Sequence, residues 1–290
     1  MKILVIGGNL FFGKKLVHKL IENKHSITVL NRQNNADDFG DKVHRIKCDR
    51  LKKEDMQRAL GETQWDIVYD QVCYDYQTAK DSCEIFNGKV KHYIHTSSQS
   101  VYEPGSEISE DAFIPSQHEF SEQADHRTQY AEAKRQAEKA FESFARFPVS
   151  YVRFCIVIGL DDYTKRFLFH INRVKTEKEI FFPNLEAKIS FITSQDAANS
   201  LYHIGMNQIT GPINCCNSGH IALSKLMKFI CDRTGKDLIE AHIQTQENSS
   251  PYGIDQNWYM DNQKLTSSGL KLGPVEIKVR KLIEESCELS

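Results

Sequence analysis

Apolar runs of strand length alternate with amphipathic segments over the first 160 residues of the chain. Lys2–Ile6 is one such run, and the segment after it carries apolar residues at the spacing of a helix. Thr128–Phe144 is rich in Ala, Glu and Lys, which favours a helix, and Val149–Ile158 is rich in β-branched residues, which favours a strand. The same criteria predict strands over Ser26–Leu30, Val43–Cys48, Asp66–Val72 and His92–His95, and helices over Glu54–Leu60 and Gln77–Phe86.

Strands separated by helices in this rhythm are typical of βαβ units. The sequence therefore predicts an α/β fold with a doubly wound (Rossmann) parallel sheet over residues 1–160. The rhythm then loosens, and we expect residues 161–290 to form a smaller C-terminal lobe that is interleaved with the edge of the sheet. The elements predicted there are helices over Thr164–Val174, Leu223–Arg233 and Val275–Glu285, and strands over Glu179–Phe182, Ile189–Ile192, Ile213–Cys215 and Leu238–Ile243.

The composition is that of an ordinary globular protein: of 290 residues, 40% are hydrophobic and 26% are charged. The 37 Lys and Arg residues and 39 Asp and Glu residues give a formal net charge of -2. Binding to nucleic acid through its phosphates requires a basic excess. The charge balance therefore favours a small molecule over a nucleic acid as the partner.

The sequence contains no run of 18 uncharged apolar residues, so we expect no membrane-spanning helix and no membrane partner. The opening segment MKILVIGG lacks the apolar length and cleavage site of a secretory signal, which favours a cytoplasmic location. The eight cysteines are scattered and include no C-x-x-C pair. This pattern indicates reduced thiols, and we expect neither a disulfide framework nor a metal site.

A glycine-rich turn between the first strand and the first helix is the strongest local signal. Such a turn lets backbone amides approach a pyrophosphate, and the helix N-terminus adds its partial positive charge. The alternative is a tight strand-to-helix turn without a ligand. The residues predicted to bind a dinucleotide here are Gly7, Asn9, Leu10, Phe11 and Gly13.

The second predicted strand leads into Asn31 and Arg32, where dinucleotide-binding proteins recognise the adenosine ribose. An acid at this position binds the 2′-hydroxyl of NAD, and an arginine accommodates the 2′-phosphate of NADP. Asn31 suits a hydroxyl and Arg32 suits a phosphate, although Arg32 could equally be a solvated side chain at the start of a loop. We expect NAD or NADP as the cofactor, and Arg32 favours NADP.

Two Tyr-x-x-x-Lys pairs occur, Tyr76/Lys80 and Tyr130/Lys134, and roughly one is expected by chance. The spacing places a phenol and an ammonium on one helix face, where the cation stabilises a phenolate that accepts a proton. Tyr130 begins a strongly predicted helix and follows a strand that ends in Ser98, whereas Tyr76 precedes that strand. A hydroxyl at the carboxyl end of a strand faces the crevice where open α/β sheets bind ligands. We therefore predict that the catalytic residues are Ser98, Tyr130 and Lys134, and that the other pair is a chance match.

With these motifs in this order, most of the chain resembles the NAD-dependent epimerase/dehydratase family of extended short-chain dehydrogenases/reductases, which includes nucleotide-sugar epimerases. The resemblance implies that the predicted catalytic residues form the family's triad. It also implies that Asp49, after the third strand, lies where the adenine is bound. The segments that carry the resemblance besides the glycine turn are Ser97–Tyr102, Tyr130/Lys134, Arg153, Phe191–Ile192, Gln195–Ala198 and Ile213–Asn214.

The resemblance implies an NAD(P)-dependent epimerase/dehydratase or reductase that acts on a hydroxyl or keto carbon of a nucleotide sugar or similar small molecule. Residues 1–160 would then bind the dinucleotide and residues 161–290 the substrate, and a homodimer is a further expectation. The sequence departs from the family pattern at Leu10, in place of a glycine, and at Tyr69–Gln71, in place of small residues on the nicotinamide side. A divergent branch with a similar turn includes RNA-binding chloroplast relatives. The alternative function is therefore a cofactor-bound regulatory or RNA-binding protein of the same fold without turnover.

Overall fold

The computed structural model describes residues 1–288, which divide into two compact units that alternate along the chain. Each unit is assembled from separate segments. Unit 1 comprises Met1–Tyr102, Glu110–Phe154 and Ala197–Cys215, and unit 2 comprises Glu103–Ser109, Cys155–Asp196 and the chain from Cys216 onward.

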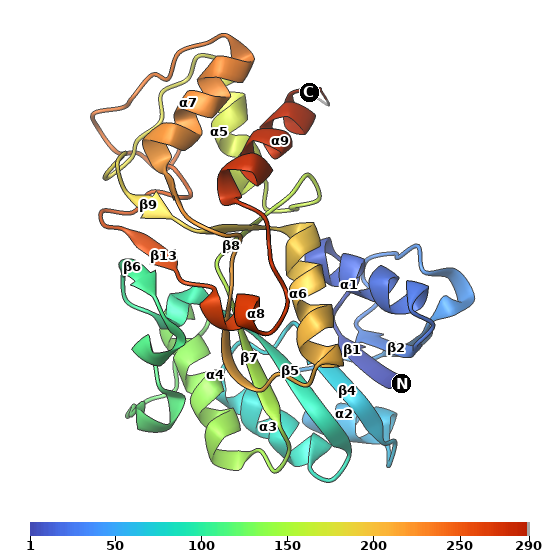
Figure 1. Ribbon diagram of the computed structural model, residues 1–290. Coiled ribbons are helices and arrows are strands. Elements are labelled where there is room, and N and C mark those ends of the chain that lie inside the picture. The colour runs from blue at the N-terminus through green and yellow to red at the C-terminus, as the bar shows by residue number, and fades with distance from the viewer. Residues whose placement is uncertain (289–290) are drawn as a thin grey trace. The chain divides into compact units, whose positions relative to one another are not determined.

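Unit 1 alternates strands with helices along most of its length (Figure 1). Its strands are β1 (Lys2–Ile6), β2 (Ser26–Asn31), β3 (His44–Lys47), β4 (Trp65–Asp70), β5 (Val90–Ser98), β7 (Val149–Phe154) and β11 (Gly211–Cys215). Its helices are α1 (Phe11–Glu22), α2 (Lys53–Leu60), α3 (Tyr76–Phe86), α4 (Tyr130–Phe144) and most of α6 (Ser194–Met206). Its short 3-10 helices are η1 (Gly40–Lys42), η2 (Gln99–Val101), η3 (Glu110–Ala112) and η4 (Pro115–Gln117).

The strands of unit 1 form one 7-stranded parallel sheet in the order β11-β7-β5-β4-β1-β2-β3. The chain runs outward from β1 to β3 and then returns to form β4 on the other side of β1. This reversal creates a switch point at the carboxyl ends of β1 and β4, where open α/β sheets bind their ligands. The doubly wound parallel sheet predicted from the sequence is therefore confirmed.

Helices cover both faces of this sheet. Successive residues of a strand point to opposite faces, so neighbouring residues of β4 contact helices on opposite sides of the sheet. Val68 of β4 packs into an apolar cluster with residues of α2, α3 and α4. Its neighbour Tyr69 points the other way, toward α6, where a Cβ on Gly205 would collide with the tyrosine hydroxyl. Helix α1 lies beside α6, since Lys19 Nζ donates to Asn199 Oδ1 at 2.9 Å.

Unit 2 is built from shorter elements around an apolar cluster to which α5, α7 and α9 contribute. Its strands form a parallel β10-β8 pair and a 4-stranded sheet in the order β12-β9-β13-β6. The strands are β6 (Gly105–Ile108), β8 (Ile156–Ile158), β9 (Lys188–Ile189), β10 (Phe191–Thr193), β12 (Ile221–Ala222) and β13 (Trp258–Met260). The helices are α5 (Arg166–Lys175), α7 (Leu223–Thr234), α8 (Gln263–Ser267) and α9 (Val275–Glu288). The division into functional domains at residue 160 stays a prediction.

Four predicted strands differ from the structure. Ile189–Ile192 is split at Ser190 into β9, which pairs with β12 and β13, and β10, which pairs with β8. Val149–Ile158 is not continuous, because β7 ends at Phe154 and β8 pairs with β10 instead of joining the large sheet. Glu179–Phe182 and Leu238–Ile243 form only isolated bridges. In Leu238–Ile243 the two isoleucines that suggested a strand face solvent, with Ile239 45% and Ile243 78% exposed.

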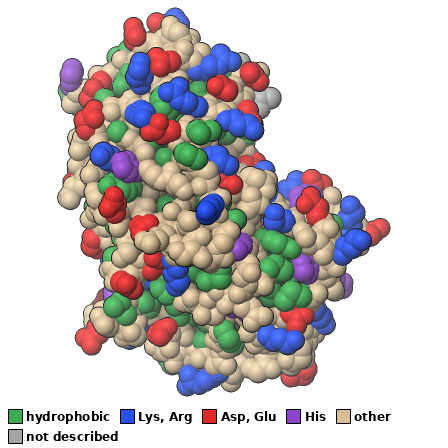
Figure 2. Space-filling model, in the orientation of Figure 1, with side chains coloured by type: hydrophobic (Ala, Val, Ile, Leu, Met, Phe, Trp, Pro, Cys, Tyr) green, Lys and Arg blue, Asp and Glu red, His purple; other side chains and the backbone are tan. Residues whose placement is uncertain are grey.

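The surface carries both signs of charge, and acidic and basic side chains are interspersed on the face drawn in Figure 2. None of the helices within residues 1–288 has the length and apolar character needed to cross a membrane.

Candidate active site

Helix α4 places Tyr130 and Lys134 one turn apart. Tyr130 is the first residue of the helix and is 41% exposed, whereas Lys134 is only 2% exposed. The Nζ of Lys134 lies 5.9 Å from the centre of the Tyr130 ring. The structure therefore pairs an accessible phenol with a buried ammonium.

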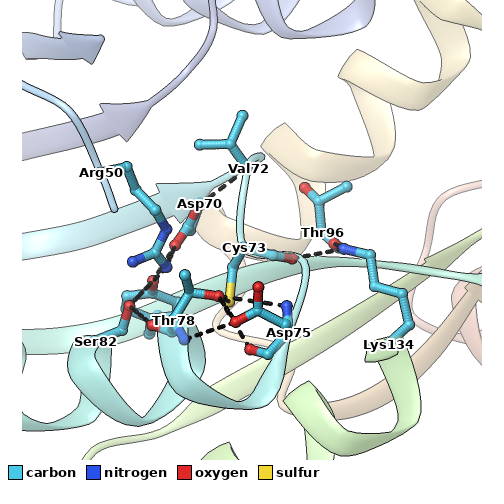
Figure 3. Close-up of polar contacts among 10 residues, drawn as sticks. Arg50, Asp70, Val72, Cys73, Asp75, Thr78, Ser82, Thr96 and Lys134 are labelled. Carbon is cyan, nitrogen blue, oxygen red and sulfur yellow. Dashed lines mark hydrogen bonds and ion pairs between the residues drawn. The ribbon is translucent and has the colours of Figure 1, made fainter. Parts of the chain in front are cut away.

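Two backbone carbonyls bind the buried Lys134 ammonium. Its Nζ donates to the carbonyl oxygen of Cys73 at 2.7 Å and to that of Thr96 at 2.9 Å (Figure 3). The same Nζ lies 4.8 Å from the centre of the Tyr74 ring. We call these two carbonyls and the Tyr74 ring the lysine cradle. An ammonium has three N–H donors, so the two carbonyls leave one for a ligand.

Ser98 ends β5, two residues after Thr96 of the lysine cradle. Its Oγ accepts the backbone N–H of Ser100 at 3.1 Å and caps η2. The preceding residue, Ser97, donates to Glu138 Oε1 at 2.5 Å and so holds the end of β5 against α4. The three residues predicted to be catalytic thus lie on a strand end and a helix that are bonded to each other.

The second Tyr-x-x-x-Lys pair lies in aromatic packing. The ring of Tyr76 is 5.2 Å from that of Phe120 and 6.2 Å from that of Phe144, centre to centre. Lys80 Nζ lies 5.3 Å from the centre of the Phe144 ring. These contacts give the pair a packing role, as expected for a chance match.

The glycine-rich turn has a backbone that favours glycine and brings α1 close to β1. Gly7 and Gly8 have φ of 91° and 83°, a region that favours glycine. A Cβ on Gly8 would lie 2.6 Å from Val5 Cγ1, so only glycine lets α1 approach β1 this closely. The N-cap of α1, Leu10, gives no side-chain cap, and the first turn contains no acidic residue. The N–H groups of this turn therefore suit an anion.

The remaining residues of the turn differ in exposure and in backbone conformation. Leu10 is 43% exposed, and Phe11 has φ of 50°, a left-handed conformation that is strained for a bulky residue. A Cβ on Gly13 would collide with the side-chain carbonyl of Gln71, whose Nε2 is buried without a hydrogen-bond partner in the described chain. Gln71 departs from the family pattern, and its side chain lies against the glycine turn.

The last residue of β2 and the loop after it carry the residues predicted to recognise the adenosine ribose. Asn31 Oδ1 accepts the N–H of Gln33 at 2.8 Å, and Arg32 is exposed. Asn9 Nδ2 donates to the carbonyl oxygen of Asn35 at 3.2 Å, which ties the glycine turn to this loop. The glycine turn and the loop after β2 thus form one connected edge.

The loop after β3 contains Asp49, whose Oδ1 accepts the N–H of Leu51 at 3.0 Å. Sequence reasoning missed its neighbour Arg50, which is 7% exposed and forms an ion pair with the fully buried Asp70 at the end of β4. Burial alone would lower the pKa of Arg50, but the charge of Asp70, its hydrogen bond to Arg50 and the nearby Cys73 and Tyr93 together outweigh burial and raise that pKa above its usual value. Asp70 was visible as a departure from the family pattern, but no signal in the sequence linked it to Arg50.

A second buried ion pair joins Arg153 of β7 to Glu138 of α4, with Nη2 and Oε2 2.6 Å apart. Arg153 also donates to the Tyr102 hydroxyl at 2.7 Å and to the carbonyl oxygens of Glu110 and Phe113 at 2.8 and 3.0 Å. Glu138 follows Lys134 by four residues, and this spacing was a usable signal that it shares the inner face of α4.

The chain matches a known protein family over most of its length. The model of the "NAD dependent epimerase/dehydratase family" matches residues 3–215. Among curated proteins, no sequence matches the chain.

Solved structures share the fold over the whole chain. UDP-glucuronic acid 4-epimerase from Bacillus cereus, in complex with UDP-glucuronic acid and NAD, is 18% identical with a TM-score of 0.75, covering 100% of both chains. UDP-glucose 4-epimerase from Thermotoga maritima is 19% identical with a TM-score of 0.73, covering 100% of this chain and 99% of its own. dTDP-glucose 4,6-dehydratase from Bacillus anthracis is 13% identical with a TM-score of 0.77, covering 100% of this chain and 97% of its own.

Proposed function

Since the chain belongs to the NAD-dependent epimerase/dehydratase family, we propose that Ser98, Tyr130 and Lys134 catalyse hydride transfer at a hydroxyl or keto carbon of a nucleotide sugar or similar small molecule. The chain is an enzyme of this family. The observation that carries the proposed site is the exposed Tyr130 phenol beside the buried Lys134 ammonium.

Tyr130 is the proton-transfer group in this proposal. As the phenolate, it takes the proton of the substrate hydroxyl while the hydride leaves the same carbon; as the phenol, it returns that proton when a keto group is reduced. Ser98 Oγ holds the substrate oxygen. Lys134 orients the cofactor ribose with the N–H that the lysine cradle leaves. Bound NAD or NADP would supply the hydride acceptor and donor.

The cofactor would lie along the carboxyl edge of the large sheet. The uncapped first turn of α1 would bind its pyrophosphate through backbone N–H groups. Asp49, after β3, would contact the adenine. The residues proposed to hold the cofactor are Gly7, Asn9, Leu10, Phe11, Gly13, Asn31, Arg32, Asp49, Tyr130 and Lys134.

Tyr130→Phe tests the proposal, because it keeps the ring and deletes only the hydroxyl. We expect turnover to fall by about 10²–10⁴ while the affinity for NAD+ stays the same. Tyr76→Phe is the matched control and should keep its activity. The substrate is found by screening nucleotide sugars and small ketones for cofactor absorbance change or epimer formation. Full activity in Tyr130→Phe would refute the assignment, and tight RNA binding at physiological salt without any turnover would refute the enzymatic function.

Native mass spectrometry separates the two outcomes of hydride transfer. An epimerase returns the hydride to its substrate and has no need to release cofactor, so NAD+ should remain bound through purification. A reductase exchanges its cofactor in each cycle and should be purified empty. The likeness in fold to UDP-sugar epimerases supports a nucleotide sugar and retained cofactor.

Arg32 would set the choice between NAD and NADP. No carboxylate ends β2, and Asn31 Oδ1 is engaged by Gln33, so Arg32 is the group here that suits a 2′-phosphate. In Arg32→Ala the Kd for NADP+ should rise about tenfold to hundredfold with little change for NAD+. An unchanged ratio of the two constants would show that Arg32 is only a solvated side chain.

Location and assembly complete the proposal. All eight cysteines are free thiols, which supports a reducing, cytoplasmic environment. We expect a homodimer, and light scattering of the purified protein would measure it directly.

A further inference from the structure

The turn between β4 and α3 supplies two of the three parts of the lysine cradle. The Cys73 carbonyl binds Lys134 Nζ, and the ring of the next residue, Tyr74, lies against the same ammonium. The position of Lys134 therefore depends on the conformation of this short segment.

Hydrogen bonds hold the segment along its length (Figure 3). Asp70 Oδ1 accepts the N–H of Val72 at 3.0 Å. The Cys73 thiol lies 3.6 Å from Thr78 Oγ1, and burial raises the pKa of this thiol to about 11, so it stays protonated near neutral pH. Asp75 Oδ1 accepts the N–H of Thr78 at 2.9 Å and caps α3. The segment is thus held by Asp70 on one side and by the first turn of α3 on the other.

Asp70 is itself held by buried partners from two other elements. Its Oδ2 accepts the Tyr93 hydroxyl of β5 at 2.5 Å and also binds Arg50 Nη2. The same Nη2 donates to Ser82 Oγ of α3 at 2.8 Å. Nε and Nη1 of Arg50 are buried and have no hydrogen-bond partner among residues 1–288, so the guanidinium depends on these two contacts. Removing the carboxylate would leave a buried cation without its counter-charge.

We propose that Asp70, with Arg50 and Tyr93, is a positioning residue for Lys134: it fixes the β4–α3 turn and so places the Cys73 carbonyl and the Tyr74 ring against the ammonium. Arg50 directly follows Asp49, so the same contacts join the loop proposed to bind adenine to the lysine proposed to bind the ribose. The inference rests on the proposed function only for the use of Lys134 by the cofactor.

Site-resolved acetylation tests the placement of Lys134 without a substrate. The native protein is treated briefly with acetic anhydride, and mass spectrometry gives the rate at each lysine. In the wild type we expect Lys134 to react far more slowly than Lys91, whose side chain is 80% exposed. In Asp70→Asn, which keeps the side-chain size, the Lys134 rate should rise at least about tenfold while the Lys91 rate stays the same.

Ser150→Ala is the matched control. It removes a buried hydroxyl that bonds His92 Nε2 and the Ile209 carbonyl, each at 2.6 Å, in the same sheet but outside the cradle and the contacts of Asp70. It should lose stability yet keep Lys134 slow. Tyr93→Phe deletes one contact of Asp70 and should give an intermediate Lys134 rate, which keeps the test open if Asp70→Asn does not fold. A protected Lys134 in folded Asp70→Asn or in Tyr93→Phe, or an equal rise in Ser150→Ala, would overturn the inference.

Calorimetric titration with NAD+ gives a second readout. The Kd should rise about tenfold in Asp70→Asn and stay near the wild-type value in Ser150→Ala. A wild-type protein that binds neither NAD+ nor NADP+ would refute the proposed function, whereas the acetylation rates would still decide the placement of Lys134.

Discussion

Glu138→Gln should destabilise the protein strongly, because it removes the charge that balances the fully buried Arg153. Both side chains have no exposed surface, and two hydrogen bonds, of 2.6 and 3.1 Å, join them. Removing one partner of a buried ion pair typically costs about 3–5 kcal/mol. Glutamine keeps the size of the side chain and one acceptor oxygen, and Arg153 retains the Tyr102 hydroxyl and two carbonyls. We therefore expect a loss near the lower end, about 3 kcal/mol.

Urea denaturation of the wild type and Glu138→Gln measures this loss in the free energy of unfolding. For a chain of this size, about 3 kcal/mol corresponds to a fall in Tm of roughly 5 °C. Ser97 also donates to Glu138, so Ser97→Ala is run in parallel to measure that bond alone.

A double-mutant cycle identifies the charge as the cause. Arg153→Met removes the cation, and in Glu138→Gln/Arg153→Met no charge is left to be stranded. The coupling energy between the two sites should be about 2–3 kcal/mol. A Glu138→Gln variant within about 1 kcal/mol of the wild type would refute the reasoning. Single variants whose effects add to within about 0.5 kcal/mol would refute it as well.

Two further results are expected. Gly13→Val should abolish NAD+ binding at a cost in stability of about 1–3 kcal/mol, because its Cβ would collide with Gln71; unchanged affinity in a folded variant would contradict this. Acid should destabilise the protein below pH 6.5, because burial lowers the pKa of His92 and of His170 to about 4 while unfolded imidazoles titrate near 6.5. Between pH 4 and 6.5 the unfolded chain therefore binds more protons than the folded protein. The free energy of unfolding falls as the pH drops, by about 2 kcal/mol per histidine at pH 5. A Tm that stays constant from pH 7.5 to 4.5 would be inconsistent with this.

Periodicity predicted the elements of the large sheet because most of its strands bury apolar residues; β3, none of whose four residues is buried, is the exception. The ends were less accurate where side chains decide them. β4 was expected to run to Val72 but ends at Asp70, because the Asp70 side chain accepts the N–H of Val72 and turns the chain. A local hydrogen bond of this kind leaves no trace in a hydrophobic pattern.

The proposed catalytic pair could be predicted because Tyr130 and Lys134 are neighbours in one helix. The lysine cradle could not, because it is made of backbone carbonyls that lie 61 and 38 residues from Lys134 in the sequence. Carbonyl groups occur at every residue, so only the fold selects Cys73 and Thr96. The ion pair between Arg50 and Asp70 could not be predicted for a related reason, since two charged residues 20 positions apart carry no periodic signal.

The strand order has a consequence for how the protein can be made. β11 lies at the edge of the large sheet beside β7, yet it is synthesised more than 50 residues after β7. All six residues of β7 are buried. Until β11 leaves the ribosome, β7 is an unprotected edge whose backbone groups can pair with another chain. A nascent or truncated chain that stops near residue 160 should therefore aggregate, because it lacks the segment Gly211–Cys215 that pairs with this edge.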